Sequence, residues 1–234
     1  MSMQIEAEVL FIKVGKVTTT KLENQKREEL VSAIKKYPVQ NAYLTKTGFK
    51  EDEQADLRHH GGENKALFLF AKTTYEKINK ECNTEFKIDG VSHFGENLIL
   101  SNIDEKTVCI GDIYKVGEAI IQITQPRQPC WKLSANTNKK EMTKFIFNSG
   151  LTGWYAKVIK EGVISKHDKL VLEQRVEDEL TISVLNKLIL NPYENETLSK
   201  KALASEVLGK QFLTSLEKRY KNKDEDKQFE IYHS

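Results

Sequence analysis

The sequence predicts a mostly β domain up to about residue 174, followed by a small unit of three helices. Short apolar and β-branched runs recur along the first part of the chain, and three amphipathic helical patterns follow one another in the second. A chain of 234 residues can bury a sizeable core, and 39% hydrophobic with 30% charged residues is an ordinary globular balance. We therefore expect a β domain at residues 1–174 and a helical unit with a charged tail at residues 175–234.

The predicted strands are apolar runs too short for helices, at residues 5–12, 66–71, 108–123, 154–159 and 170–172. The run at 108–123 reads as two strands that join or bend near Gly117. Within it Ala119, Ile121 and Ile123 alternate with other residues, so one face of the strand is wholly apolar. The charged segment at residues 21–36 fits a loop or a short helix, and its pattern does not choose between them.

Helices are predicted where apolar spacing and end signals agree. Thr73 with Glu76 forms a capping-box pattern that starts a helix towards Glu81. A second short helix spans 141–148 and ends at Gly150. The three C-terminal helices are marked by apolar residues on one side of each: Val184, Leu185, Leu188 and Ile189; Leu198, Ala202 and Leu203; Phe212, Leu213, Leu216 and Tyr220.

Charge and cysteine content exclude several classes of protein. The 36 basic residues are offset by 34 acidic ones, whereas a nucleic-acid binder concentrates positive charge. No apolar stretch approaches the roughly 20 residues of a membrane span, and the N-terminus lacks the pattern of a secretory signal. Cys82, Cys109 and Cys130 are too few and too widely spaced for a disulfide framework. We expect a cytoplasmic protein that binds neither nucleic acid nor membrane.

Four polar segments lie between apolar runs, where function usually resides, at residues 48–54, 59–62, 94–98 and 125–132. The last is the most informative, because Cys130 follows a proline and lies between Arg127 and Lys132. Nearby cations stabilise a thiolate, the form that acts as nucleophile or metal ligand. The alternative is that Cys130 is a small buried hydrophobe, as free cysteines usually are. For Cys109 and Cys82 that structural interpretation is favoured.

The pair His59-His60 suggests metal binding, yet neighbouring residues of a strand point to opposite faces. Gly61 and Gly62 permit a turn, and also a close approach of backbone amides to a phosphate or a pterin edge. A histidine pair in a loop is more often only hydrogen-bonded. Zinc would need three or four ligands, more than this segment and Cys130 readily supply.

Asn97, next to Glu96, can both donate and accept hydrogen bonds, which suits recognition of a heterocycle edge, although a simple turn explains the pair equally well. Gly111-Asp112 is interpreted as a turn between strands. Trp131 and Tyr155 can stack on a flat base, but core packing is favoured for both.

Together these segments resemble a known family. The ordered series resembles that of MOSC domains, relatives of the C-terminal domain of molybdenum cofactor sulfurases, and most of all the stand-alone bacterial YiiM type with its appended three-helix unit. The likeness runs from about Val9 to Tyr220, and its ordered motifs are specific as a set: His60-Gly61-Gly62; Phe94-Gly95-Glu96-Asn97-Leu98; Gly111-Asp112; Gln125-Pro126-Arg127-x-Pro129-Cys130-x-Lys132.

The resemblance implies a strongly twisted β-barrel-like domain and an enzyme that needs molybdenum cofactor (molybdopterin) but no pyridoxal phosphate. Cys130 maps onto the family's cysteine and would coordinate molybdenum as a thiolate, while His60 would supply a proton. The expected cofactor-binding residues are Arg127, Asn97, Glu96, Gly61, Gly62, Lys132 and Gln54. The implied activity is a detoxifying reduction of N-hydroxylated small molecules such as N-hydroxylated purine bases.

Two other functions stay open. The first is a non-catalytic carrier of the cofactor, or of sulfur bound to Cys130. The second is a thiol hydrolase with Cys130 as nucleophile and His60 as base. A reductase would also need a separate electron-donor protein, since the sequence has no iron–sulfur, flavin, nicotinamide or haem motif. We expect a monomer or homodimer.

Overall fold

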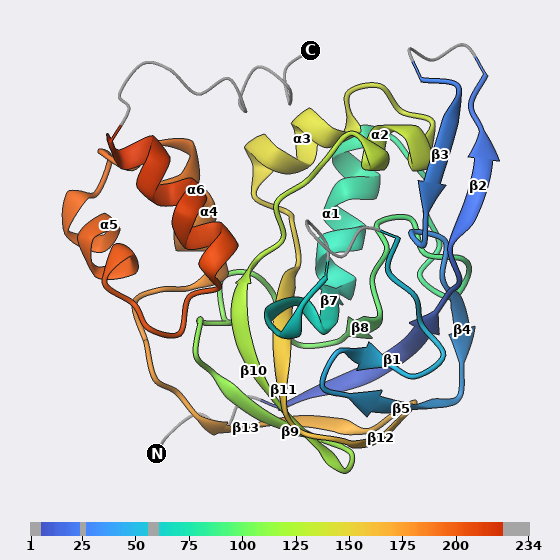
Figure 1. Ribbon diagram of the computed structural model, residues 1–234, viewed down its shortest axis with the longest axis horizontal. Helices are drawn as coiled ribbons and strands as arrows, with labels where there is room; N and C mark the ends of the chain where they lie inside the picture. The colour runs from blue at the N-terminus through green and yellow to red at the C-terminus, as the bar shows by residue number, and fades with distance from the viewer. Residues whose placement is uncertain (1–5, 24–26, 56–60, 222–234) are drawn as a thin grey trace.

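The fold is a closed β-barrel with helices packed around it (Figure 1). The computed structural model describes residues 6–23, 27–55 and 61–221. Seven strands form the ring in the order β13-β9-β10-β11-β7-β8-β1, and β13 pairs back onto β1, which closes it. These strands are β1 (Glu6–Val14), β7 (Leu67–Ala71), β8 (Leu98–Leu100), β9 (Ile113–Val116), β10 (Ala119–Pro126), β11 (Trp154–Lys160) and β13 (Lys169–Gln174). The mainly β, barrel-like fold predicted from the sequence is confirmed.

Among the described residues, six further strands lie outside the ring. Strand β4 (Tyr37–Val39) extends the main sheet from β1, while β12 (Gly162–Ser165), β5 (Asn41–Thr45) and β6 (Gly48–Phe49) form a three-stranded sheet. Strands β2 (Thr18–Lys21) and β3 (Glu29–Ser32) pair antiparallel in a sheet of their own that projects at the upper right of Figure 1. The β2–β3 pair, together with β4, stands beside the loops that later form the pocket.

Both faces of the central strands are buried, as their continuous apolar runs predict. Leu67 and Leu69 of β7 belong to one hydrophobic cluster, whereas Phe68 and Phe70 of the same strand belong to a second. The predicted apolar face of β10 joins the first cluster. The barrel wall therefore has a hydrophobic core on each side, which fixes the register of the strands that carry the polar loops.

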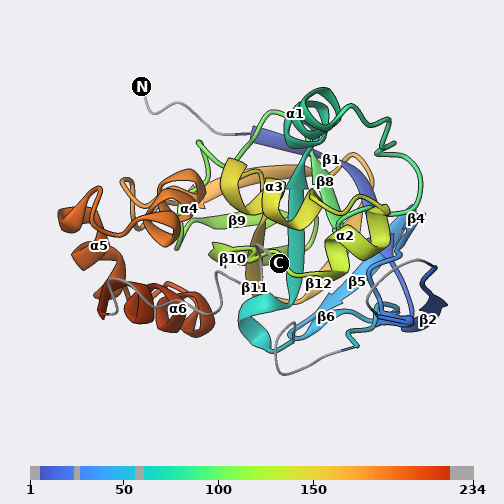
Figure 2. The same ribbon diagram turned by 90° about the horizontal axis from the view of Figure 1, so that it is seen from above.

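Helices α1 (Lys72–Cys82), α2 (Lys132–Thr137) and α3 (Met142–Ser149) lie on one side of the barrel, and the 3₁₀ turn η1 (Glu63–Lys65) precedes β7 (Figures 1 and 2). The capping-box interpretation of Thr73 is wrong. Ala71 occupies the N-cap position of α1 with no side-chain cap, because the buried strand β7 runs directly into the helix. Helix α3 ends at Gly150 in a left-handed conformation, as predicted.

The three predicted C-terminal helices are present as α4 (Ile182–Leu190), α5 (Glu196–Leu203) and α6 (Lys210–Lys221). The side chains of Thr181 and Asn195 cap the first two of these helices. These helices lie at the edge of the molecule opposite the β2–β3 pair (Figures 1 and 2), and their Leu185 and Phe212 share the hydrophobic cluster of the barrel. The division into units at 1–174 and 175–234 stays a prediction.

The segment at residues 21–36 is neither of the alternatives considered, because its described part contributes to the β2–β3 pair. Lys21 ends β2 after three consecutive threonines at 18–20, and burial alternates along β3, where Leu30 and Ser32 are buried. The first strand expected at 108–123 begins only at Ile113, because residues 108–112 turn around Asp112. Helix α2 and strands β4, β5, β6, β8 and β12 were not predicted.

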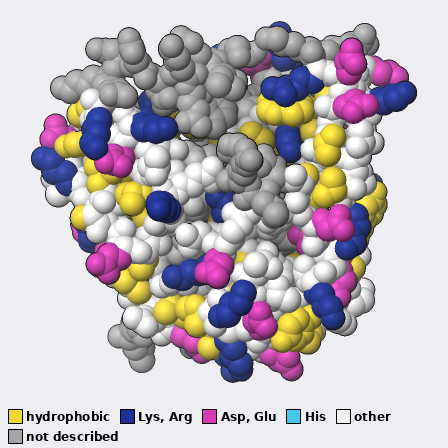
Figure 3. All heavy atoms as spheres, in the orientation of Figure 1, with side chains coloured by type: hydrophobic (Ala, Val, Ile, Leu, Met, Phe, Trp, Pro, Cys, Tyr) yellow, Lys and Arg dark blue, Asp and Glu magenta, His cyan; other side chains and the backbone are white. Residues whose placement is uncertain are grey.

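Charged side chains of both signs are dispersed over one face of the molecule. On the face shown in Figure 3, basic and acidic side chains alternate without a large patch of either sign. Within the described part of the chain, no helix is both long and apolar enough to cross a membrane.

Candidate functional site

A pocket of about 600 Å³, counted to its opening to solvent, lies where several polar loops meet. Its lining combines charged, polar and aromatic side chains, as in sites for small molecules. The described lining residues come from the loop after β3, the 52–55 segment, η1, β7, the 94–97 loop, the 127–132 loop and β11: Ser32, Ala33, Ile34, Lys36, Asp52, Glu53, Gln54, Ala55, Lys65, Phe68, Phe94, Gly95, Asn97, Arg127, Cys130, Lys132 and Tyr155.

Arg127 and Cys130 both face this pocket, as the sequence predicts for neighbours in a ligand-binding loop. Arg127 is 5% exposed, and its guanidinium lies 5.7 Å from the centre of the Phe68 ring. Its backbone N–H donates to the carbonyl of Gly153 at 3.1 Å. Gly153 has φ +65°, and a Cβ there would lie 2.6 Å from the Leu69 carbonyl oxygen, so glycine is needed for this close packing.

Cys130 is half-buried at the end of the loop, just before α2. Its carbonyl oxygen accepts hydrogen bonds from Leu133 N and Thr143 Oγ1, each at 3.0 Å. These bonds fix the backbone from both α2 and α3. The sulfur therefore stands at a defined edge of the pocket and not inside a core.

Tyr155 lines the pocket and also belongs to the second hydrophobic cluster, so the core packing favoured from the sequence is confirmed. Its ring packs on Phe68 with 5.1 Å between centroids, and Lys65 Nζ lies 5.5 Å from the Tyr155 centroid. Burial raises the pKa of Tyr155, and the positive charge of Arg127 opposes that rise. The two rings give the pocket an apolar wall between cations.

Lys65 connects the pocket to the C-terminal helices. Its ammonium donates to the side-chain oxygen of Gln211 on α6, and Gln54 Nε2 donates to the Lys65 carbonyl at 3.4 Å. The η1 turn is also held by Thr124 Oγ1 of β10, which donates to the Asn64 carbonyl at 2.6 Å. Gln54 thus lines the pocket, and α6 helps to position one of the pocket's cations.

Another cation of the pocket lining, Lys36, pairs with Asp52. Asp52 also accepts from the backbone N–H of Gly15 at 2.8 Å and from Asn97 Nδ2 at 2.9 Å. Burial lowers the pKa of Lys36, while the carboxylate of Asp52 counteracts this shift. Neither residue was a predicted site residue. Lys36 ends the charged segment 21–36, and Asp52 lies in the polar segment 48–54, of which only Gln54 was given a role.

Asn97 lines the pocket, but its side chain serves the fold. Besides Asp52, its Nδ2 donates to the Lys13 carbonyl, and its Oδ1 accepts from Phe68 N at 3.2 Å. Glu96 is fully buried and is not among the described lining residues. It pairs with Lys13 at 2.8 Å and accepts from Tyr75 Oη at 2.8 Å. These contacts favour supporting roles over the cofactor contacts predicted for both residues.

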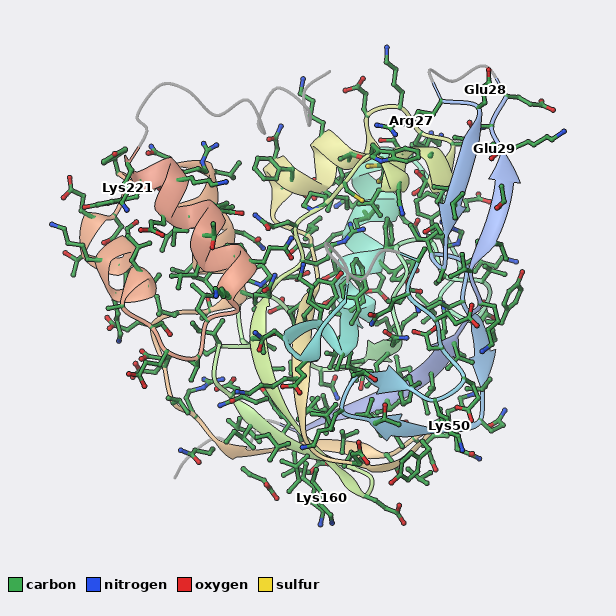
Figure 4. All side chains as sticks on the ribbon, viewed as in Figure 1. Arg27, Glu28, Glu29, Lys50, Lys160 and Lys221 are labelled. Carbon is green, nitrogen blue, oxygen red and sulfur yellow. The ribbon has the colours of Figure 1, made fainter. Side chains whose placement is uncertain are left out.

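Lys132 lines the pocket beside the β2–β3 pair. Its Nζ donates to the Val31 carbonyl at 3.0 Å. Arg27, seen near the free end of that pair in Figure 4, lies 4.4 Å from the centre of the Trp131 ring. Trp131 is thus engaged outside the pocket, and the β2–β3 pair is tied to the cysteine loop at two points.

The remaining predicted residues fall into two groups. His59 and His60 lie outside the described residues, so the proton-donor role of His60 stays a prediction. Gly62 has φ +92° and leads into η1, and its carbonyl accepts from Lys65 N at 2.9 Å. The cofactor contacts expected of Gly61 and Gly62 stay a prediction.

The other cysteines lie away from the pocket lining. Cys109 is fully buried, and burial together with the charge of Asp112 raises the pKa of its thiol to about 11. It therefore stays protonated at neutral pH, in line with the structural interpretation. Cys82 ends α1, also as expected.

The described lining has four cations, at positions 36, 65, 127 and 132, against two carboxylates. This excess of positive charge beside a cysteine suits an anionic ligand whose reactive centre binds a soft sulfur. Elsewhere in the described ranges, no group of three or more His, Cys, Asp or Glu side chains is arranged to hold a metal ion.

Comparison with known proteins gives a consistent result. The family model of the MOSC domain matches residues 56–171. The chain is 33% identical to an uncharacterised Bacillus subtilis protein, YflK, over 90% of this chain and 93% of that protein. It is 36% identical to Escherichia coli protein YiiM over 63% of this chain and 66% of YiiM. The crystal structure of YiiM from Geobacillus stearothermophilus superposes with a TM-score of 0.73 at 28% identity, covering 91% of this chain and 98% of that one.

A longer relative is a Gibberella moniliformis protein described as a reductase. It is 34% identical over 63% of this chain, but the match spans only 26% of the fungal protein. The shared part is therefore about a quarter of that relative.

Proposed function

Because the chain belongs to the MOSC domain family, we propose that it is a molybdenum-cofactor-dependent oxidoreductase that reduces N-hydroxylated compounds, including N-hydroxylated purine bases. One observation carries the proposal. The half-buried Cys130 opens into the same pocket as four cations and an aromatic wall. A fungal relative described as a reductase supports redox chemistry.

The pocket residues fit a molybdenum cofactor. A phosphate-bearing pterin requires cations, which Arg127, Lys65 and Lys132 supply, and a planar guanidinium can donate two parallel hydrogen bonds to a phosphate. Phe68 and Tyr155 offer flat apolar surface to a ring. The thiolate of Cys130 is a soft ligand of the kind that molybdenum takes.

When bound, the cofactor supplies the two-electron chemistry that breaks the N–O bond. The residues of the chain bind the cofactor and orient the substrate. Arg127 and Lys65 hold negative charge, Cys130 provides the ligand sulfur, and the wall of Phe68 and Tyr155 positions a flat base. The bonds from Leu133 and Thr143 to the Cys130 carbonyl keep that sulfur in place.

The electrons come from a separate donor protein in this proposal. A sequence without an iron–sulfur, flavin or haem motif needs such a partner. In the laboratory an artificial one-electron dye can replace it.

The test is cofactor-replete protein from a host that makes molybdenum cofactor. We expect about one molybdenum per chain and dye-supported reduction of N-hydroxyadenine to adenine. Cys130→Ala should lose most of the metal and all turnover while its melting temperature stays close to wild type. Cys82→Ala is the matched control, because Cys82 ends a helix away from the pocket lining and should keep both.

Metal bound without turnover of any N-hydroxylated substrate would favour the carrier function. Full metal content and full activity in Cys130→Ala would contradict the thiolate assignment. A thiol hydrolase would show metal-free ester or amide hydrolysis that disappears in the same variant.

A further inference from the structure

Lys36 occupies an unusual position for a lysine. Its side chain is 7% exposed, yet it lines the pocket. Its backbone is held on both sides by Ser92, whose Oγ accepts from Lys36 N at 2.8 Å and whose N–H donates to the Lys36 carbonyl at 2.8 Å. Fixing the backbone so tightly limits the positions that the ammonium can reach.

The ammonium group of Lys36 has hydrogen-bond donors left for a ligand. A lysine ammonium has three N–H donors. One goes to Asp52, and among the described residues no other acceptor contacts Nζ. Asp52 itself accepts from Gly15 N, Asn97 Nδ2 and Lys36 Nζ, which holds the carboxylate in one orientation. The pair therefore fixes the ammonium in place and leaves part of it directed at whatever fills the pocket.

Hydrogen-bond donors left over in a buried position call for an acceptor, since desolvating a charged donor without a partner is costly. The reduction proposed above provides one. It reads R–NH–OH + 2 e⁻ + 2 H⁺ → R–NH₂ + H₂O, so the leaving oxygen must gain a proton.

We propose that Lys36 is the general acid of this reaction and that Asp52 and Asn97 are its positioning residues. The inference deepens the proposed function and rests on it. Lys36 donates to the hydroxyl oxygen of the bound substrate. The N–O bond breaks with the two electrons that the donor protein supplies through the cofactor, and the Lys36 proton converts the departing hydroxyl into water. The nitrogen takes the second proton from solvent, and solvent then reprotonates Lys36.

The charges around Lys36 suit a lysine that gives up a proton. Burial lowers the pKa of Lys36, and the carboxylates of Asp52 and Glu96 raise it again. The other charged or titratable groups of the pocket and its wall are Lys13, Glu53, Lys65, Arg127, Cys130, Lys132 and Tyr155. An acid works best when its pKa is near the operating pH, which burial favours here.

The experiment compares wild type with Lys36→Arg, which keeps the charge but cannot release a proton at neutral pH, and with Lys36→Met. Lys160→Met is the matched control, because Lys160 is exposed at the end of the barrel opposite the β2–β3 pair (Figure 4). Four quantities are measured on loaded protein: molybdenum content, melting temperature, the Kd for N-hydroxyadenine without reductant, and the pH profile of kcat.

We expect both Lys36 variants to keep their metal and Lys36→Arg to bind substrate within about threefold of wild type. The kcat of each should fall by about 10²–10⁴-fold, the usual contribution of a general acid. Wild-type kcat should decrease as pH rises through the pKa of Lys36, and this basic limb should be absent in Lys36→Met. Lys160→Met should match wild type throughout.

Lys36→Arg with unchanged kcat and an unchanged basic limb would overturn the inference. So would loss of molybdenum in Lys36→Met with metal and rate both kept in Lys36→Arg, because Lys36 would then hold an anionic part of the cofactor. If Lys36→Met fails to fold, the pH profile of kcat for Lys36→Arg alone tests whether Lys36 is the general acid. Wild type that is fully loaded but inactive on every N-hydroxylated substrate would refute the proposed function itself.

Discussion

Two buried carboxylates, Asp112 beside β9 and Asp52 in the pocket, each pair with a cation, but one cation is an arginine and the other a lysine. Asp112 is fully buried and accepts from Arg175 Nε at 2.9 Å, Arg175 Nη2 at 2.7 Å and the backbone N–H of Cys109 at 3.0 Å. Tyr114 Oη donates a fourth bond at 3.2 Å. This network ties the turn before β9 to the residue that follows β13.

The cation that pairs with Asp52 is a lysine, whereas the cation that pairs with Asp112 is an arginine. Arg175 presents a planar fork that Asp112 satisfies from two sides, and Arg175 donates its further bond to the Thr107 carbonyl. Lys36 presents a single ammonium that Asp52 satisfies only in part. A guanidinium cannot lose its proton in a protein, whereas a buried ammonium can. A two-pronged Arg–Asp pair whose carboxylate accepts four hydrogen bonds is suited to stabilising the fold, while a Lys–Asp pair that leaves ammonium donors unused is suited to proton transfer.

The largest expected effect is a difference in unfolding free energy between a variant that breaks the Arg175–Asp112 pair and one that breaks the Lys36–Asp52 pair. Asp112→Ala should cost about 3 kcal/mol of unfolding free energy, the low end for breaking a buried pair, because Arg175 is 30% exposed and gains some water. Asp52→Ala should cost about 1–2 kcal/mol, since Lys36 can escape its lost partner by deprotonating. Urea unfolding of both variants measures the difference.

The Asp52→Ala loss should also depend on pH. The folded-state pKa of Lys36 lies below its ordinary value of 10.5 and falls further without Asp52. The unfolded chain therefore binds the proton more tightly, and stability decreases as pH falls from about 10.5 towards the lowered pKa. A pH-independent loss equal to that of Asp112→Ala would remove the distinction between the two pairs.

An intermediate effect concerns the pocket arginine. If Arg127 clamps the cofactor with its planar fork, Arg127→Lys should weaken retention by about 1–3 kcal/mol although the charge is kept. Molybdenum content after dialysis, with Arg127→Gln alongside, measures this. Near-normal retention in Arg127→Lys with loss in Arg127→Gln would mean that only charge matters, as for a cation that favours the Cys130 thiolate. Wild-type metal and rate in both variants would make Arg127 structural.

The smallest expected effect is a pH dependence of stability that comes from a third buried carboxylate, Glu105, which extends the comparison of Asp112 with Asp52. Glu105 is 4% exposed, accepts from Thr74 Oγ1 at 2.8 Å and Gly153 N at 3.0 Å, and forms no ion pair within the described part of the chain. Burial raises its pKa above the ordinary 4.5. The folded state then holds the proton more tightly than the unfolded chain, so stability is full at low pH and is lost as pH rises through the raised pKa.

Glu105→Gln removes that titration and keeps the shape of the side chain. The stability of wild type relative to Glu105→Gln should therefore decline as pH rises from 4.5, as followed by urea unfolding at several pH values. A constant difference across this range would mean that Glu105 titrates normally despite its burial.

The sequence by itself determined the features that depend on local patterns. Alternation at Ala119, Ile121 and Ile123 placed a strand with one buried face, and apolar spacing placed the three C-terminal helices, because period and end signals are encoded in neighbouring residues. The ordered motifs also indicated the family and singled out the Cys130 loop. Barrel closure came from that resemblance, since the pairing of β13 with β1 joins residues about 160 positions apart.

Only the tertiary structure decided which polar residues share the pocket and which hold the fold together. Lys36 and Asp52 were assigned no role from the sequence, because the desolvation of a charged side chain is a property of the assembled loops and not of the segment. Asn97 and Glu96 read as ligand contacts, yet their hydrogen bonds go to Phe68, Lys13 and Tyr75, which converge only when β1, α1 and β7 meet. Gln211 reaches Lys65 across 146 positions for the same reason. Hydrogen bonds between side chains so far apart in the sequence depend on how the elements pack, and local sequence patterns do not encode that packing.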